Sequence, residues 1–226
     1  MSWIPPNRLK PASLRVFTSK LAHKSLLSLL AIALTLIGFY PYIRSILNGH
    51  TQPHVFSWVI WSLTTTLVFF GQLAAHAGVG AWPTGVAGVL SMGICILAYR
   101  KKGDLHISKI DWLFLGIALS TIPLWAITSD PLWTVVILTA ADILGFLPTI
   151  RKSYHSPFNE NMTMYALLFL SNIVAILALE SISVTTVIFP MAMSVAIGIF
   201  IPLVMIRRYY PTPHPGPTNT LLPPEI

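Results

Sequence analysis

The sequence predicts an all-α integral membrane protein with seven transmembrane helices in a 3+1+3 arrangement of two parallel triple-helix-bundle repeats. The first observation is composition, since the 226 residues are 54% hydrophobic and only 9% charged, with a mean hydropathy of +0.72. Soluble domains carry about 25% charged residues. The second is a series of seven apolar segments of membrane-spanning length. The third is an internal repeat.

The repeat aligns residues 26–100 on residues 133–207 without a gap, at a shift of 107 residues. A single register holds from the first apolar segment of each copy to the last, which indicates duplication of a three-helix unit. Parallel repeats of this kind are typical of membrane transporters, which place a substrate site between the two halves. The coinciding pairs include Gly38 and Gly145, Phe39 and Phe146, Pro41 and Pro148, Arg44 and Arg151, Trp58 and Tyr165, Thr64 and Ser171, and Pro83 and Pro190.

Each predicted span follows from its apolar run, because about 20 residues of helix cross a bilayer. Segment 112–128 has no repeat partner, and a fourth crossing lets the second copy start on the same side as the first. The predicted organisation is a basic N-terminal tail, a first bundle, a linker with the fourth helix, a second bundle and a Pro-rich tail, at 1–25, 26–100, 101–132, 133–208 and 209–226. The predicted spans are 26–44, 56–76, 82–99, 112–128, 132–150, 162–179 and 184–206.

Basic residues follow the first, third, fifth and seventh spans, which end on one face of the bundle. The loops on the opposite face hold Asp130 and Glu180 and no Lys or Arg. Positive charge marks the cytoplasmic side, so we expect an N-out, C-in protein of the plasma membrane, or of the inner membrane in a bacterium. The basic, acid-free stretch Met1–Lys24 argues the other way. It also fits a transit peptide or an interfacial tail.

Several function classes are not expected. The net charge of +7 is spread over the span ends rather than gathered in a basic patch with interleaved aromatics, so we expect no nucleic-acid partner. The single cysteine, Cys95, excludes an intramolecular disulfide and a cysteine metal cluster. No nucleophile–base constellation or metal-ligand spacing is present, so we expect neither an enzyme nor a cofactor or metal.

Two prolines at equivalent positions, Pro41 and Pro148, lie inside the first and fifth spans near the basic face. An interior proline removes a backbone hydrogen bond and kinks the helix. The pair is therefore a candidate hinge for opening and closing that face. Pro83 and Pro190 are expected in the first turns of their helices, where proline is tolerated and structural.

Asp142 lies at membrane depth in the fifth span, and its repeat equivalent is Thr35. An ionised carboxylate there is costly unless it faces a cavity or a partner. The functional interpretation is proton coupling, or recognition of a cationic or hydroxyl-rich solute. The alternative is a protonated, structural aspartic acid that hydrogen-bonds to neighbouring backbone.

A polar pair on the sixth span, Ser171 and Asn172, matches Thr64 and Thr65 on the second. Such a stripe fits a central binding site, and it fits helix–helix hydrogen bonding equally well. Trp58 and Trp61 share a helix face. We expect Trp61 to stack on a solute and Trp58 to anchor the helix at the interface. The predicted solute-binding residues are Trp61, Thr65, Asp142 and Asn172.

The segments Gly38–Arg44 (GFYPYIR) and Gly145–Arg151 (GFLPTIR) each precede a short polar loop and another apolar helix. They resemble the PQ-loop motif of the PQ-loop/MtN3/SWEET superfamily, and the resemblance covers about residues 26–208. The motif is degenerate, because Tyr42 and Thr149 stand where the family has glutamine. The resemblance implies a transporter whose substrate lies between the two bundles, with Asn172 and Trp61 as counterparts of the family's site residues.

The predicted function is transport of a small polar solute, such as a sugar, an amino acid or a vitamin precursor, by alternating access. The alternative is a non-transporting membrane receptor or interaction protein on the same scaffold, which the Pro-rich tail 209–226 favours. The expected partners are the solute and the lipid bilayer. The oligomeric state is left open, with a homo-oligomer among the alternatives.

Overall fold

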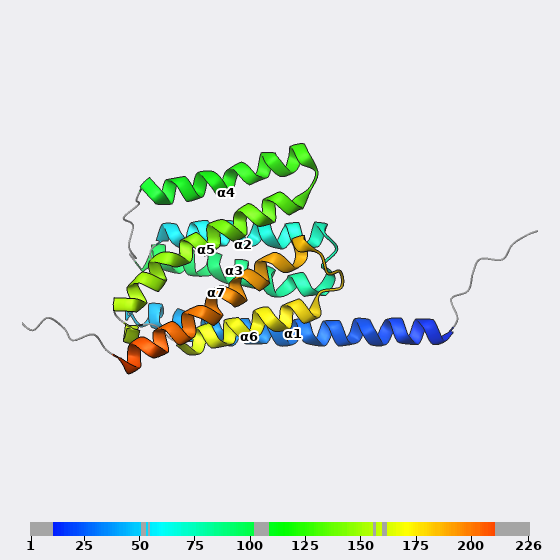
Figure 1. Cartoon of the computed structure of the whole chain (residues 1–226), viewed down its shortest axis with the longest axis horizontal. Coiled ribbons are helices and arrows are strands. Elements are labelled where there is room, and N and C mark those ends of the chain that lie inside the picture. The colour runs from blue at the N-terminus through cyan, green and yellow to red at the C-terminus, as the bar shows by residue number, and fades with distance from the viewer. Residues whose placement is uncertain are drawn as a thin grey trace, which may run out of the picture.

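The structure is a computed structural model that describes residues 11–50, 53, 55–101, 109–155, 157–159 and 162–210. These residues form seven α-helices and two short 3-10 helices, η1 and η2, which confirms the predicted all-α class. Figure 1 shows the α-helices running along one common axis. Their bounds are α1 Pro11–Leu47, α2 Val55–Ala74, α3 Trp82–Arg100, α4 Lys109–Thr128, α5 Pro131–His155, α6 Met162–Ala178 and α7 Val184–Tyr209, with η1 at Gly78–Ala81 and η2 at Pro157–Asn159.

Four of the helical segments are long and apolar enough to cross a membrane, by length and composition. They are Thr18–Leu47, Val55–Ala74, Gly78–Arg100 and Val184–Tyr209. The other three helices contribute shorter apolar stretches of 10–17 residues. Large apolar side chains also face outward, with Ile127 82% and Val89 73% exposed. These features agree with a protein embedded in a membrane.

The third helix of each repeat lies between the other two. In the first half, α1 to α3, helix α3 packs against both α1 and α2, and in the second half, α5 to α7, helix α7 packs against both α5 and α6. The halves meet through two long interfaces, α1 along α6 and α2 along α5. Helix α4 packs on α5 and touches α2, at the edge of the bundle (Figure 1).

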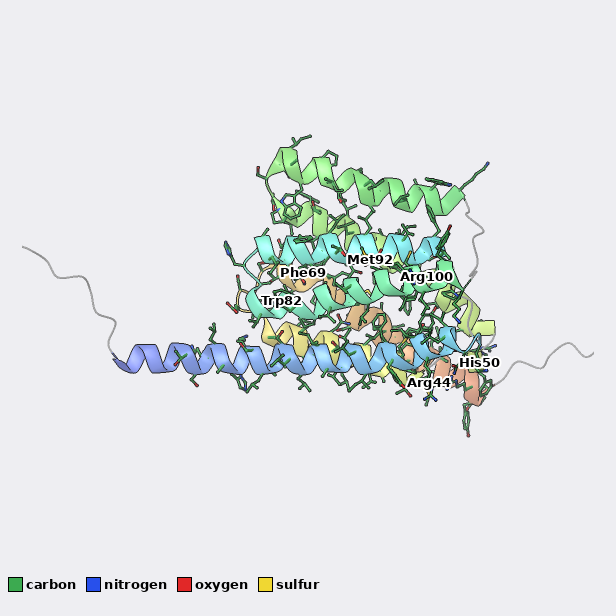
Figure 2. All side chains as sticks on the ribbon, turned by 180° about the vertical axis from the view of Figure 1, so that it is seen from behind. Arg44, His50, Phe69, Trp82, Met92 and Arg100 are labelled. Atoms are coloured by element: carbon green, nitrogen blue, oxygen red, sulfur yellow. The ribbon has the colours of Figure 1, made fainter. Side chains whose placement is uncertain are left out.

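The two ends of the bundle differ in charge. Figure 2 shows Arg44, His50 and Arg100 at one end, which we call the basic end, and Phe69 and Trp82 towards the other. Arg207 and Arg208, in the last turn of α7, also lie at the basic end. The opposite end holds η1 and the loop 179–183 between α6 and α7, and we call it the η1 end.

Helix α1 begins at Pro11 rather than at residue 26, so the expected tail boundary at residue 25 falls inside a helix. Residues 12–37 contain neither glycine nor proline, and proline at a first helical position is well tolerated, so nothing in this stretch stops the helix. The 37 residues of α1 span about 55 Å at 1.5 Å per residue. Its N-terminal part therefore projects beyond the η1 end of the other helices (Figure 1).

Pro190 does not lie in the first turn of its helix, so that prediction is wrong. Helix α7 starts at Val184 because Ser183 forms a capping box, in which the Ser183 hydroxyl accepts from the Thr186 N–H and the Thr186 hydroxyl accepts from the Ser183 N–H. Pro190 thus lies inside the helix. Pro83 does lie at the start of α3, as predicted.

Candidate functional site

The Asp142 carboxylate is buried where α5 packs on α2. Its side chain is 6% exposed, and the Thr64 hydroxyl on α2, itself fully buried, donates a 2.7 Å hydrogen bond to Asp142 Oδ1. The same hydroxyl lies 3.1 Å from the carbonyls of Ile60 and Trp61. A hydroxyl has one hydrogen, so it can donate to Asp142 or to a carbonyl of its own helix, but not to both at once. Thr64 can therefore switch between Asp142 and its own helix.

One turn from this bond, Trp61 faces Gly145 across the same interface. A Cβ added at Gly145 would lie 3.1 Å from Trp61 Nε1, so the absence of a side chain at Gly145 gives the indole its space. Trp61 is three residues before Thr64, and Gly145 is three after Asp142, so each pair shares a helix face. The α2–α5 interface thus brings together two of the four predicted solute-binding residues, Trp61 and Asp142.

The α1–α6 interface carries a matching hydrogen bond between Thr35 and Ser171, whose hydroxyl oxygens lie 2.7 Å apart. At the repeat shift of 107 residues, Thr35 corresponds to Asp142 and Ser171 to Thr64. A glycine also lies at this interface, where a Cβ at Gly38 would lie 3.4 Å from Leu167 and 3.7 Å from Leu168, the repeat equivalent of Trp61. The same positions therefore meet in both interfaces, which is the relation expected of a pseudo-two-fold axis between two copies.

The two matched interfaces differ in chemistry. The Thr35 and Ser171 hydroxyls are neutral, and each also lies within 3.0 Å of the Ala31 carbonyl. On the other side, a carboxylate replaces a hydroxyl and an indole replaces the Leu168 side chain. Both functional groups are thus concentrated at α2–α5, while α1–α6 keeps small neutral groups. The α2–α5 interface is the candidate functional site.

Thr65 and Asn172 occupy different surroundings. Thr65 is buried and lies two turns before Gln72, whose amide bonds to the Thr186 carbonyl of α7. Residues seven apart share a helix face, so Thr65 lies on the α7-facing side of α2. Asn172 is half-buried, and its Nδ2 donates to the Leu168 carbonyl of its own helix at 2.8 Å. The structure does not pair Asn172 with Asp142.

Trp58 lies in the protein interior, so its interpretation as an interfacial anchor is wrong. It is 9% exposed and its ring lies 5.4 Å from Tyr42, 6.4 Å from Phe39 and 5.2 Å from Trp61. These rings from α1 and α2 form one aromatic cluster. Because Trp61 belongs to it, the cluster connects the candidate site to helix α1.

The proposed hinge is described in part. Pro41 lies inside α1 and is half-buried, next to Tyr42 in the aromatic cluster. The side chains of Pro148 and Thr149 lie outside the described residues. The hinge role of the proline pair therefore stays a prediction.

Gln72 is a buried polar residue that the sequence did not mark as central. It is fully buried, its Nε2 donates to the Thr186 carbonyl at 3.0 Å, and its Oε1 has no partner among the described residues. A glutamine inside an apolar helix was the available signal. Its neighbour His76 is exposed with φ of 59°, at the C′ position of a Schellman motif made by the bonds Ala77 N–H to Gln72 O and His76 N–H to Leu73 O.

No protein-family model, curated protein or solved structure matches this chain. Function is therefore inferred from the residues and their geometry alone.

Proposed function

We propose that this protein is a multi-pass membrane transporter that moves a small polar solute by alternating access. In this proposal α1–α3 and α5–α7 are two parallel triple-helix bundles, α4 is the linker, and the arrangement is the 3+1+3 layout of PQ-loop and SWEET-like carriers. Support comes from packing, since the third helix of each half lies between the other two, and the first helix of each half packs along the second helix of the other.

The observation that carries the proposal is the buried Asp142–Thr64 hydrogen bond with its neutral counterpart Thr35–Ser171. Ionisable groups at membrane depth mark substrate or proton paths. Transporters built from repeats place their sites where the repeats meet. Asp142 carries an ionisable carboxyl group, whereas its repeat equivalent, Thr35, carries a neutral hydroxyl. We assign it to proton exchange or to recognition of a cationic or hydroxyl-rich solute.

Trp61 and Thr65 complete the proposed solute path. An indole offers a flat apolar face on which a sugar ring or a heterocycle stacks, and a threonine hydroxyl both donates and accepts hydrogen bonds. The candidate solutes are thus a sugar, an amino acid or a vitamin precursor. Asn172 would join this path only in a state in which its amide leaves the Leu168 carbonyl.

The proposed orientation is N-out and C-in, in the plasma membrane or a bacterial inner membrane. Basic side chains gather at one end of the bundle, and Asp130 and Glu180 lie in loops at the other. The N-terminal lysines oppose this orientation. However, Lys24 Nζ donates to the Leu177 and Leu179 carbonyls at 2.8 and 2.7 Å. Its positive charge therefore stabilises the negative end of the α6 helix dipole.

Uptake into proteoliposomes tests the proposal, using a pooled panel of labelled sugars, amino acids and nicotinamide riboside, with and without a pH gradient. We expect the wild type to take up at least one member. We expect Asp142→Asn to keep the acceptor oxygen for Thr64 but to lower uptake about tenfold or abolish its response to the gradient, because the ionisable group is gone.

The matched control is Asp130→Asn, the same change at an exposed carboxylate that accepts from the Leu132 N–H at 2.8 Å. It should leave uptake unchanged. Wild-type uptake and pH response in folded Asp142→Asn would make Asp142 structural.

The Pro-rich tail lies outside the described residues, and a transporter lacking residues 211–226 should keep its flux, whereas a tail-dependent interaction protein should lose its partner.

A further inference from the structure

Pro190 leaves one backbone carbonyl of α7 without its helical partner. An interior proline has no N–H, so the carbonyl four residues earlier, that of Thr186, receives no helical hydrogen bond. Gln72 Nε2 of α2 donates to this carbonyl instead, at 3.0 Å and in a fully buried position. The orientation of the amide is fixed, because a carbonyl only accepts and the NH₂ group must face it. A proline in one half is thus matched by a glutamine in the other.

A second contact between the halves lies at the η1 end. Glu180, in the loop between α6 and α7, accepts a 3.0 Å hydrogen bond from the Val79 N–H in η1, and its own N–H donates to the Ala77 carbonyl at 3.0 Å. Gly78 makes this fit possible, because it has a positive φ of 62° and a Cβ there would overlap the Glu180 carboxylate. The two loops are therefore bonded together by backbone and side chain.

Lys24 adds a third contact of the same kind, from α1 to the end of α6. At the basic end, two described hydrogen bonds join elements of the same half. Lys101 donates to the Leu47 carbonyl at 3.3 Å, and Arg207 donates to the Tyr154 carbonyl at 3.1 Å. Gln72, Glu180 and Lys24 thus each bond across the two halves at or near the η1 end.

We propose that Glu180 and Gln72 form a latch that holds the two halves together at the η1 end, and that this latch must open in each cycle of the proposed transporter. The inference rests on the proposed function for its role in transport, but the latch itself is a property of the fold. The structure then represents the state closed at the η1 end.

The unpartnered Gln72 oxygen explains how such a latch can open. A buried acceptor without a donor is unfavourable compared with the same group in water. Opening the η1 end would let water or a hydroxyl of the solute reach Gln72 Oε1, which offsets part of the loss of the Thr186 contact. A closed state that carries this defect is easier to leave than one with all its polar groups satisfied.

Thiol accessibility tests the latch without any solute. The parent carries Cys95→Ala and a reporter Val68→Cys, one turn before Gln72, where Val68 is fully buried against Val135 and Phe189 of the other half. A membrane-impermeant methanethiosulfonate carrying a sulfonate is added to each side of oriented vesicles in turn. We expect slow labelling in the parent. The Glu180→Ala/Gln72→Leu double variant lacks the hydrogen bonds to the Val79 N–H and the Thr186 carbonyl. The reporter thiol should therefore label about tenfold faster in this variant, and only from the η1 side.

The variants have matched controls. Asp130→Ala removes a carboxylate from the α4–α5 loop at the same end and should leave labelling unchanged. Glu180→Gln keeps the acceptor oxygen and should label like the parent. Gln72→Leu replaces the amide with an apolar side chain of similar size, the residue found at the repeat equivalent, Leu179. The two single variants report separately if the double variant unfolds.

The latch is wrong if folded Glu180→Ala and Gln72→Leu variants label from the η1 side as slowly as the parent. It is also wrong if the parent already labels as fast as the double variant. Failure of the proposed function appears elsewhere, as absence of wild-type uptake, so the two failures are distinguishable.

Discussion

At the residue scale, the duplication places two different chemistries at one structural position. Thr35 and Asp142 are repeat equivalents, and each meets an equivalent hydroxyl, Ser171 or Thr64, at 2.7 Å. The chain thus contains its own control for the buried carboxylate. A comparison between the two pairs separates what the carboxylate adds from what any interhelical hydrogen bond provides.

Thr64→Val should destabilise the protein more than Thr35→Val. The first variant removes the hydroxyl that donates to a buried carboxyl group, which costs about 1–3 kcal/mol. The second leaves Ser171 its bond to the Ala31 carbonyl, so we expect a cost near the membrane average of about 0.6 kcal/mol. Denaturant unfolding in micelles measures both. Equal losses would show that Asp142 contributes no more than a hydroxyl would.

The sequence indicated part of this site and missed the pairing. Asp142 and Trp61 were predictable because a carboxylate and an indole at membrane depth are unusual in themselves. Asn172 was chosen for the same reason, yet its amide bonds to its own helix. Spacing along a helix shows which side chains share a face, but only tertiary packing decides which helix that face meets.

At the element scale, Pro190 changes the hydrogen bonding of α7 near the η1 end by leaving one backbone carbonyl without its helical donor. At the start of α3, Pro83 does not leave the Val79 carbonyl without a backbone donor, because the Trp82 N–H donates to it. The Ser28 hydroxyl of α1 also donates to this carbonyl, at 2.6 Å. Pro190 of α7 releases the Thr186 carbonyl, which accepts from Gln72 of α2. The equivalent prolines thus differ, because only Pro190 lies inside its helix and leaves a carbonyl that a side chain of the other half binds.

Pro190→Ala should weaken the dependence of stability on Gln72. Alanine restores the N–H that pairs with the Thr186 carbonyl inside α7, so the glutamine amide becomes redundant. We expect a double-mutant cycle of Pro190→Ala with Gln72→Leu to show a coupling of about 0.5–1.5 kcal/mol in thermal unfolding, the value of one hydrogen bond.

The control for this cycle is Pro202→Ala, a change at the other interior proline of α7. Its carbonyl partner lies three turns further along the helix from Thr186, so its cycle with Gln72→Leu should be additive. Additive behaviour in both cycles would show that Pro190 does not create the Gln72 contact.

At the scale of the whole molecule, the apolar runs were sufficient to predict an all-helical bundle, but not where every helix begins. Helix α1 begins at Pro11 because residues 12–37 contain neither glycine nor proline. Hydropathy alone placed the start of this span at residue 26, where the apolar run begins. The periodicity of apolar residues likewise could not predict that α1 packs along α6 and α2 along α5. In each of these interfaces a glycine, Gly38 or Gly145, lies against a larger side chain of the facing helix.

The proposed orientation in the membrane rests on the charge difference between the two ends, and it predicts which thiols react from outside. In a Cys95→Ala background, Ile182→Cys, 76% exposed in the α6–α7 loop, and Lys20→Cys on the projecting part of α1 should react with an impermeant maleimide on intact cells. Asn48→Cys, exposed at the basic end, should react only after permeabilisation. In the proposed orientation, Arg44, Arg100 and Arg208 would retain their end of the bundle on the cytoplasmic side. Lys24 has less influence on the orientation because its ammonium binds the carbonyls at the end of α6.

The reverse labelling pattern would mean that the N-terminal basic stretch sets the orientation, and it would place the η1 end and its latch in the cytoplasm. Labelling of Ile182→Cys and Asn48→Cys from the same side would contradict a membrane-spanning bundle altogether, because these residues lie at opposite ends of it.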